Sequence, residues 1–228
     1  MTEWIIILSG GAIAFVLTML VRRYALHRGV IDVPNGRSSH TIPTPRGGGL
    51  SFVIVITLIS AVFYLLGWCS DRLFIGGVIP AVLIAVVGFV DDHRGLSSRI
   101  RFIAHFIAAL VGVWFIGGLP PLMLWGVAVD LGLPGDALAV VGVVWLLNLY
   151  NFMDGIDGIA GVEGVSVPVV IGGLLMLVGK PAGEYLLFFV VAAAVMGFLI
   201  WNFPPAKIFM GDVGSVFLGI LLGLLIIG

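Results

Sequence analysis

The sequence predicts an all-α protein, a polytopic bundle of about eight transmembrane helices that forms one membrane-embedded domain over residues 1–228. Of these residues, 61% are hydrophobic and only 10% are charged, and the mean hydropathy is +1.23. Soluble globular domains are typically about 45–50% apolar and about 25% charged. The apolar residues also fall into separate runs of roughly the length that one helix needs to cross a bilayer, about 20 residues.

Eight apolar runs are bounded by charged residues or by clusters of proline and glycine. They occupy residues 4–21, 48–68, 73–90, 101–117, 136–151, 161–179, 184–201 and 213–228. The chain begins Met1-Thr2-Glu3-Trp4, without the basic residues that begin a signal peptide, so we expect the first run to be a retained helix. Between the fourth and fifth runs, residues 118–135 carry Pro120-Pro121 and Pro134-Gly135 around an apolar middle. This connection is expected to be a hairpin or a re-entrant segment.

Basic residues are concentrated in one set of connecting loops, which predicts the orientation of the bundle. That set holds Arg22, Arg23, Arg28, Arg37, Arg46, Arg94, Arg99, Arg101 and Lys207, whereas the opposite set holds Arg72 and Lys180. Because positively charged loops remain in the cytoplasm, the first set is expected to be cytoplasmic and the N-terminus to lie outside. The net charge of −1 says nothing about partners, although no nucleic-acid partner is expected, and the single Cys69 cannot form an internal disulfide.

The first cytoplasmic loop, residues 32–49, combines prolines with basic residues and a run of three glycines. Its prolines make it a shaped loop rather than a helix. Arg37, His40 and Arg46 can bind phosphate oxygens, and Gly47-Gly48-Gly49 would leave backbone N–H groups open to an anion at the start of the next helix. The alternative is that the basic residues only anchor the loop and the glycines only allow close packing.

The second cytoplasmic loop begins with Asp91-Asp92, directly after an unbroken apolar run. Adjacent carboxylates repel each other, so the pair favours a bound proton, a cation or a metal ion. This arrangement suits a general base or a metal-linked carboxylate. A solvated helix end is the alternative.

The third loop contains two asparagines and two aspartates at a spacing of three, Asn148, Asn151, Asp154 and Asp157, with a glycine after each aspartate. At this spacing the four side chains would share one face of a helix. The glycines indicate that the helix breaks here, and such breaks at membrane depth are tolerated where they line a cavity. Polar and ionisable residues within apolar sequence are functional candidates, although a simple polar turn is the alternative.

The fourth loop places Lys207 and Asp212 just before the last apolar run. Lys207 is a point charge suited to phosphate, and Asp212 could reach a metal ion or, alternatively, only cap its helix. The four loops thus gather carboxylates with Arg, His and Lys on one membrane face. Carboxylate oxygens with phosphates as co-ligands are typical of a Mg²⁺ site, whereas neither a zinc cluster nor a Walker-type phosphate loop is present.

Four motifs, in order along the chain, resemble those of the polyprenyl-phosphate N-acetylhexosamine-1-phosphate transferases. They are Pro-Thr-Pro-Arg-Gly-Gly-Gly at 43–49, Asp91-Asp92, the series from Asn148 to Gly158, and Phe-Met-Gly-Asp-Val-Gly-Ser at 209–215. That superfamily includes enzymes that start O-antigen and related glycans and the peptidoglycan lipid I synthase. Arg-Ser-Ser-His at 37–40 is more similar to the O-antigen-initiating branch, of the glycosyltransferase family 4 type.

The resemblance implies that a UDP-N-acetylhexosamine donates sugar-1-phosphate to undecaprenyl phosphate, in one step or through an aspartyl-phosphate. UMP leaves, and the lipid-linked diphosphate sugar initiates a cell-envelope glycan. The implied cofactor is Mg²⁺, with Mn²⁺ as an alternative. By position, Asp157 and Asp212 resemble the family's metal ligands and Asp91 or Asp92 the base. Contacts to the nucleotide, diphosphate or phosphate are implied for Asn148, Asn151, Asp154, His40, Arg46 and Lys207.

The same resemblance implies a multi-pass protein of the bacterial inner membrane, with its active site facing the cytoplasm and the potential to form a homodimer. Family members generally continue through further spans joined by a cytoplasmic loop with His and Arg, so the transferase domain is expected to be C-terminally incomplete here. A transporter or another intramembrane enzyme, such as an aspartyl protease, is the alternative. Such proteins would place their acids near helix midpoints, whereas these acids gather at one face.

Overall fold

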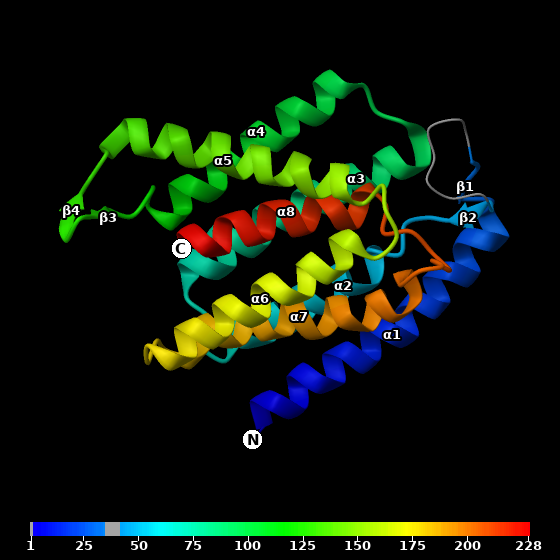
Figure 1. Ribbon diagram of the computed structural model, residues 1–228, viewed down its shortest axis with the longest axis horizontal. Helices are drawn as coiled ribbons and strands as arrows, with labels where there is room; N and C mark the ends of the chain where they lie inside the picture. Colours follow the sequence, from blue (N-terminus) through cyan, green and yellow to red (C-terminus); the bar gives the residue numbers. More distant parts are fainter. Residues whose placement is uncertain (1, 35–41) are drawn as a thin grey trace.

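The computed structural model describes residues 2–34 and 42–228, and these form a bundle of helices (Figure 1). The helices are α1 (Thr2–Arg28), α2 (Leu50–Leu65), α3 (Ile79–Arg94), α4 (Ser98–Ile116), α5 (Gly132–Met153), α6 (Ile159–Leu177), α7 (Ala182–Asn202) and α8 (Asp212–Ile227). A π-helical segment, η1 (Arg72–Val78), leads directly into α3. Each of the eight predicted spans corresponds to one helix, so the predicted all-α membrane bundle is confirmed.

Six of these helical segments are long and apolar enough to cross a membrane, namely α1, η1 with α3, α4, α5, α6 and α7. The other two, α2 and α8, have 16 residues each. Most helices extend beyond the predicted runs, and α1 and α5 extend furthest. α1 continues through its basic residues to Arg28, and α5 begins at Gly132 rather than at residue 136. The second difference arises because Pro134 was assigned to a loop, whereas proline is compatible with the first turn of a helix.

The centre of the bundle is α8, which is buried from Val213 to Leu225. Its sequence is apolar on all sides after Ser215, and a helix of this kind is stable only when other elements surround it. It packs mainly against α3 and α5, while α7 packs against α1 and α6 (Figure 1). The first residue of α8 is therefore held at the junction of several helices.

Two short hairpins complete the fold. β1 (Ile31–Asp32) pairs antiparallel with β2 (Thr44–Pro45). β3 (Leu122–Leu124) pairs antiparallel with β4 (Val127–Val129) between α4 and α5. Of the two structures considered for residues 118–135, the hairpin is therefore the correct one.

The connections that carry the predicted polar residues lie at one end of the bundle. There α3 ends and α4 begins, α5 ends and α6 begins, and α7 ends and α8 begins. The β3–β4 hairpin lies at the opposite end (Figure 1). The membrane face on which each end lies stays a prediction from the distribution of basic residues.

Candidate active site

Asp92 joins the last turn of α3 to the first turn of α8. Its carboxylate accepts hydrogen bonds from the backbone N–H groups of Asp212 (3.2 Å) and Val213 (3.1 Å). These N–H groups have no partner within their own helix, and a carboxylate at this position also interacts favourably with the helix dipole. The two helices can approach because Gly88 has no side chain, since a Cβ there would lie 2.7 Å from the backbone carbon of Asp212. Asp92 of α3 thus caps the N-terminus of α8.

Asp91 forms an ion pair with Arg101, which lies in the first turn of α4. Nη1 of Arg101 donates to Asp91 Oδ2 at 2.7 Å and to Asp212 Oδ2 at 3.3 Å. The other oxygen of Asp91 accepts from the backbone N–H of Leu96. One guanidinium therefore links carboxylates from α3 and α8.

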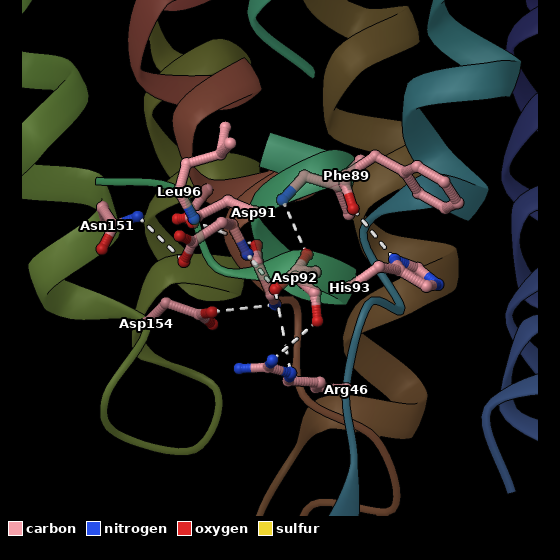
Figure 2. Close-up of polar contacts among 12 residues, drawn as sticks. Arg46, Phe89, Asp91, Asp92, His93, Leu96, Asn151 and Asp154 are labelled. Carbon is pink, nitrogen blue, oxygen red and sulfur yellow. Dashed lines mark hydrogen bonds and ion pairs between the residues drawn. The ribbon is translucent and has the colours of Figure 1, made fainter. Parts of the chain in front are cut away.

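The residues at the end of α5 meet the same carboxylates. Nδ2 of Asn151 donates to Asp212 Oδ1 at 3.1 Å, and the backbone N–H of Gly211 donates to Asp154 Oδ2 at 3.0 Å. Figure 2 shows Asp91 and Asp92 from the end of α3, and Asn151 and Asp154 from the end of α5 and the loop after it, directed toward one region. The structure therefore brings together five of the predicted site residues: Asp91, Asp92, Asn151, Asp154 and Asp212.

Asp154 lies in the α5–α6 loop, near the carboxylates of Asp212 and Asp92. Although part of the residue remains exposed, desolvation of its carboxyl group raises its pKa well above the usual range. The negative charges of Asp212 and Asp92 raise this pKa further, and hydrogen bonds from the Gly211 and Met210 backbone oppose the shift. Both effects are expected where carboxylates converge away from water.

A cavity of about 210 Å³ opens beside these groups, between α4 and α5. Its polar lining consists of Asp91, Ser98, Arg101, His105, Asn148, Asn151 and Asp212. Asn148, which is predicted to bind substrate, donates to the carbonyl of Val144 in its own helix at 2.7 Å. The cavity therefore combines hard oxygen donors with one permanent cation.

Arg46 approaches the site from the first loop. Its Nη2 donates to the carbonyl oxygen of Asp92 at 2.6 Å, and its Nε lies 4.0 Å from Asp92 Oδ1. The glycines that follow serve a different purpose from the one predicted. The N–H groups of Gly48 and Gly49 donate to the carbonyls of Phe209 and Met210, each at 2.9 Å, so they are not open to an anion. A Cβ at Gly49 would lie 2.4 Å from Cα of Gly214, which supports the close-packing alternative.

Three predicted residues are not placed in this cluster. The carboxylate of Asp157 accepts from the backbone N–H of Ala206 at 2.9 Å, in the α7–α8 loop. Lys207 is exposed, with its Nζ 5.6 Å from the centre of the Trp201 ring. His40 lies outside the described residues, and its role stays a prediction. Among residues 2–34 and 42–228, no group of three or more His, Cys, Asp or Glu side chains is arranged to hold a metal ion.

Two residues of the site were not singled out from the sequence. Arg101 was counted only for topology, although an arginine at the start of an apolar run is itself a functional candidate. Asn202, 3% exposed, accepts from the N–H of Gly158 (3.1 Å) and donates to the carbonyl of Ile208 (3.1 Å). It thereby ties the α5–α6 loop to the α7–α8 loop. A lone asparagine at the end of an apolar run was the available signal.

Comparison with known proteins identifies the family to which this chain belongs. Residues 73–228 match glycosyl transferase family 4. The chain belongs to this family. The matched region includes all the clustered carboxylates, and the predicted membership in the polyprenyl-phosphate hexosamine-1-phosphate transferase superfamily is confirmed.

The relatives are bacterial phospho-sugar transferases. The chain is 31% identical to a probable undecaprenyl-phosphate N-acetylglucosaminyl 1-phosphate transferase of Bacillus subtilis, covering 90% of the chain and 56% of the relative. It is 31% identical to decaprenyl-phosphate N-acetylglucosaminephosphotransferase of Mycolicibacterium smegmatis, covering 95% and 57%. It is 30% identical to phospho-N-acetylmuramoyl-pentapeptide-transferase of Streptococcus thermophilus, covering 96% and 71%. The chain thus spans just over half the length of the first two relatives.

Proposed function

We propose that this protein transfers N-acetylhexosamine-1-phosphate from a UDP-sugar to undecaprenyl phosphate. Overall, an oxygen of the acceptor phosphate becomes bonded to the phosphorus that carries the sugar. The bond from that phosphorus to the bridging oxygen of the diphosphate breaks, and UMP leaves. The observation that carries the proposal is a network of carboxylates beside a polar cavity. Arg101 joins the carboxylates of α3 and α8, Asn151 donates to the α8 carboxylate, and the N–H of Gly211, just before α8, donates to Asp154 of the α5–α6 loop.

The place of the cluster in the bundle supports a lipid acceptor and a water-soluble donor. The carboxylates lie at helix ends, where α3 and α5 end and α8 begins. A lipid that remains in the bilayer and a nucleotide that arrives from water can meet only at such an interface. Carboxylates at helix ends also favour transfer over transport or intramembrane proteolysis, which would use acids near the middle of the spans. From the basic loops, we assign the site to the cytoplasmic face of the bacterial inner membrane.

The two adjacent aspartates are proposed to have different roles. Asp91 lines the cavity and faces Arg101, so it is placed to orient or deprotonate the acceptor phosphate. Asp92 is bound to the start of α8 and to Arg46, so it positions Asp212. Arg101 supplies positive charge to the phosphates, and positioning with charge neutralisation supplies most of the catalysis in phosphoryl transfer.

The donor set also fits Mg²⁺. This ion needs only one or two protein carboxylates when substrate phosphates complete its coordination, and Asp212 presents a carboxylate to the cavity beside Asn151 and Asp91. When bound, the ion would neutralise charge on the diphosphate. Of the two predicted metal ligands, Asp212 has contacts that support the role. The contact of Asp157 with Ala206 supports a role in holding the loops together.

The test is release of UMP by the purified protein in detergent or liposomes with undecaprenyl phosphate and a panel of radiolabelled UDP-N-acetylhexosamines. We expect Mg²⁺-dependent release, and Asp212→Asn should abolish it without affecting membrane insertion. Asp71→Asn, at an exposed carboxylate near the other end of the bundle, is the matched control and should retain it. Normal turnover by Asp212→Asn would refute the assignment of the site.

A further inference from the structure

The β3–β4 hairpin presents apolar side chains on both of its faces. Its strands, Leu-Met-Leu at 122–124 and Val-Ala-Val at 127–129, contain no charged or polar side chain. Five of these six residues are exposed and Val129 is half-buried. Successive side chains of a strand point to opposite faces. Neither face of the hairpin is therefore covered by the bundle.

The position of the hairpin is set by the two membrane-spanning helices that it joins. It follows the end of α4 and precedes the start of α5, and it projects beyond them at the end of the bundle away from the carboxylates (Figure 1). Acidic side chains hold its base. Asp136 accepts from the N–H of Leu119 at 2.9 Å, and Asp130 accepts from the N–H of Gly132 at 2.8 Å. The apolar strands thus lie directly beyond the ends of two helices that are long and apolar enough to cross a membrane.

The turn of the hairpin carries an aromatic residue in an unfavourable conformation. Leu124 pairs with Val127, which leaves Trp125-Gly126 as a two-residue turn with φ values of +48° and +84°. Turns with positive φ at both central positions favour Asn or Gly, and a bulky residue there is strained. Trp125 is 97% exposed, so packing within the chain does not offset this strain. A contact outside the chain is the natural reason to keep tryptophan here.

We propose that the β3–β4 hairpin is an interfacial lipid-binding element that lies in the bilayer surface opposite the active site, with Trp125 at the level of the lipid headgroups. Tryptophan is enriched in this zone because its ring is both apolar and able to donate a hydrogen bond. The hairpin does not enter the hydrocarbon core, because a two-stranded sheet leaves backbone groups unpaired along both edges. Headgroups and interfacial water satisfy those groups.

A lipid surface fits the hairpin better than a protein partner does. A second copy of the chain would cover one face and leave the other apolar face in water. Lipid can surround both faces, and the uncharged strands offer nothing for a charged partner to recognise. The adjoining surface is of the same kind, since Trp114 is 72% exposed and Leu133 is 82% exposed on the helices that flank the hairpin. The proposal does not depend on the transferase reaction.

The test is spin labelling of the reconstituted protein. Single cysteines replace Met123, Leu124 or Trp125 in a Cys69→Ser background, and a nitroxide is attached to each in phosphatidylcholine–phosphatidylglycerol liposomes. Lys180→Cys is the control, because this exposed residue lies in the α6–α7 turn, which is at the same end of the bundle. We expect labels at 123, 124 and 125 to collide several-fold more with oxygen, which dissolves in lipid, than with a water-soluble nickel chelate. The label at 180 should show the reverse.

Two results would overturn the proposal. Greater nickel accessibility at both 123 and 124 would place the hairpin in water. Shielding of one of these labels from both reagents, with dipolar broadening between copies, would indicate a second copy instead. If the labelled variants fail to reconstitute, the same question is answered with unlabelled protein. The emission lost in Trp125→Phe should be quenched by brominated lipid and protected from aqueous acrylamide, and the opposite pattern would contradict lipid contact.

Discussion

Replacing Asp92 with alanine would test whether this residue holds α8 in place. The change removes the acceptor for two N–H groups, those of Asp212 and Val213. Val213 is 1% exposed, so its N–H cannot gain a water molecule, and a buried unsatisfied donor costs about 1–3 kcal/mol. Loss of the acceptor costs less free energy at the N–H of Asp212, because this residue lines the cavity. The charge at the helix N-terminus contributes a further 0.3–1 kcal/mol, roughly.

The expected loss in the free energy of unfolding is therefore about 2–4 kcal/mol. For chains of about 150–250 residues, each kcal/mol lowers the melting temperature by about 2–4 °C, which gives roughly 10 °C. Unfolding can be followed by the reaction of Cys69 with a fluorogenic thiol reagent, because this single cysteine is 5% exposed and becomes accessible only when the chain opens.

Asp130→Ala is the matched control for this measurement. Asp130 also accepts from a backbone N–H at the start of a helix, that of Gly132 in α5, but it is exposed. Water can replace the carboxylate of Asp130, so the free energy of unfolding should fall by about 1 kcal/mol and the melting temperature by only a few degrees. If Asp92→Ala were no less stable than Asp130→Ala, the capping role of Asp92 would be wrong.

Three other changes test separate parts of the site. Asp154→Asn should lower UMP release but not stability. Because the folded-state pKa of Asp154 is raised, its contribution is present below the unfolded pKa and is lost as pH rises through the folded pKa. Without metal, the variant's melting temperature should therefore exceed that of the wild type by a margin that grows from pH 5 to pH 8, and a constant difference would contradict the burial of a carboxyl group. Arg101→Ala should reduce UMP release at least about tenfold, because it removes more than about 1.4 kcal/mol of charge stabilisation from the transition state. Arg99 is exposed, so Arg99→Ala is the control and should not reduce UMP release. Equal activities of the two variants would exclude Arg101 from the site. Asn202→Ala should lower the free energy of unfolding by about 1–3 kcal/mol, because two buried backbone partners lose their hydrogen bonds, and an unchanged melting temperature would show that the loops do not depend on it.

Hydropathy alone was sufficient to predict the membrane bundle. In a bilayer the backbone must satisfy its own hydrogen bonds, and an apolar run of sufficient length does so by forming a helix. Each of the eight runs does so. The errors are at helix ends, where Arg28 and Gly132 extend α1 and α5. There the local signal is weak, because proline and charged residues are compatible with both a helix turn and a loop.

The composition of the site was also predictable in part. Asp91, Asp92, Asn151, Asp154 and Asp212 were identified because polar groups are costly in apolar sequence and are kept there for a reason. Arg101 is also a charged residue at the start of an apolar run, and by the same reasoning it is a functional candidate. Lys207 shows the limit of the argument, since a basic loop residue can bind phosphate or simply remain in solvent, and the structure places it over Trp201.

The roles of these residues depend on the tertiary structure. The amino-acid sequence alone predicted that the chain forms membrane helices and that polar groups collect at one end of them. It did not determine that Asp92 caps a helix 120 residues later, or that Arg101 bridges Asp91 and Asp212. These contacts join segments with no local relation, and they form only because α8, apolar on every side, must be enclosed by α3 and α5. Burial of that helix places its first residue among the carboxylates, and so the packing of the bundle decides which of two adjacent aspartates faces the cavity.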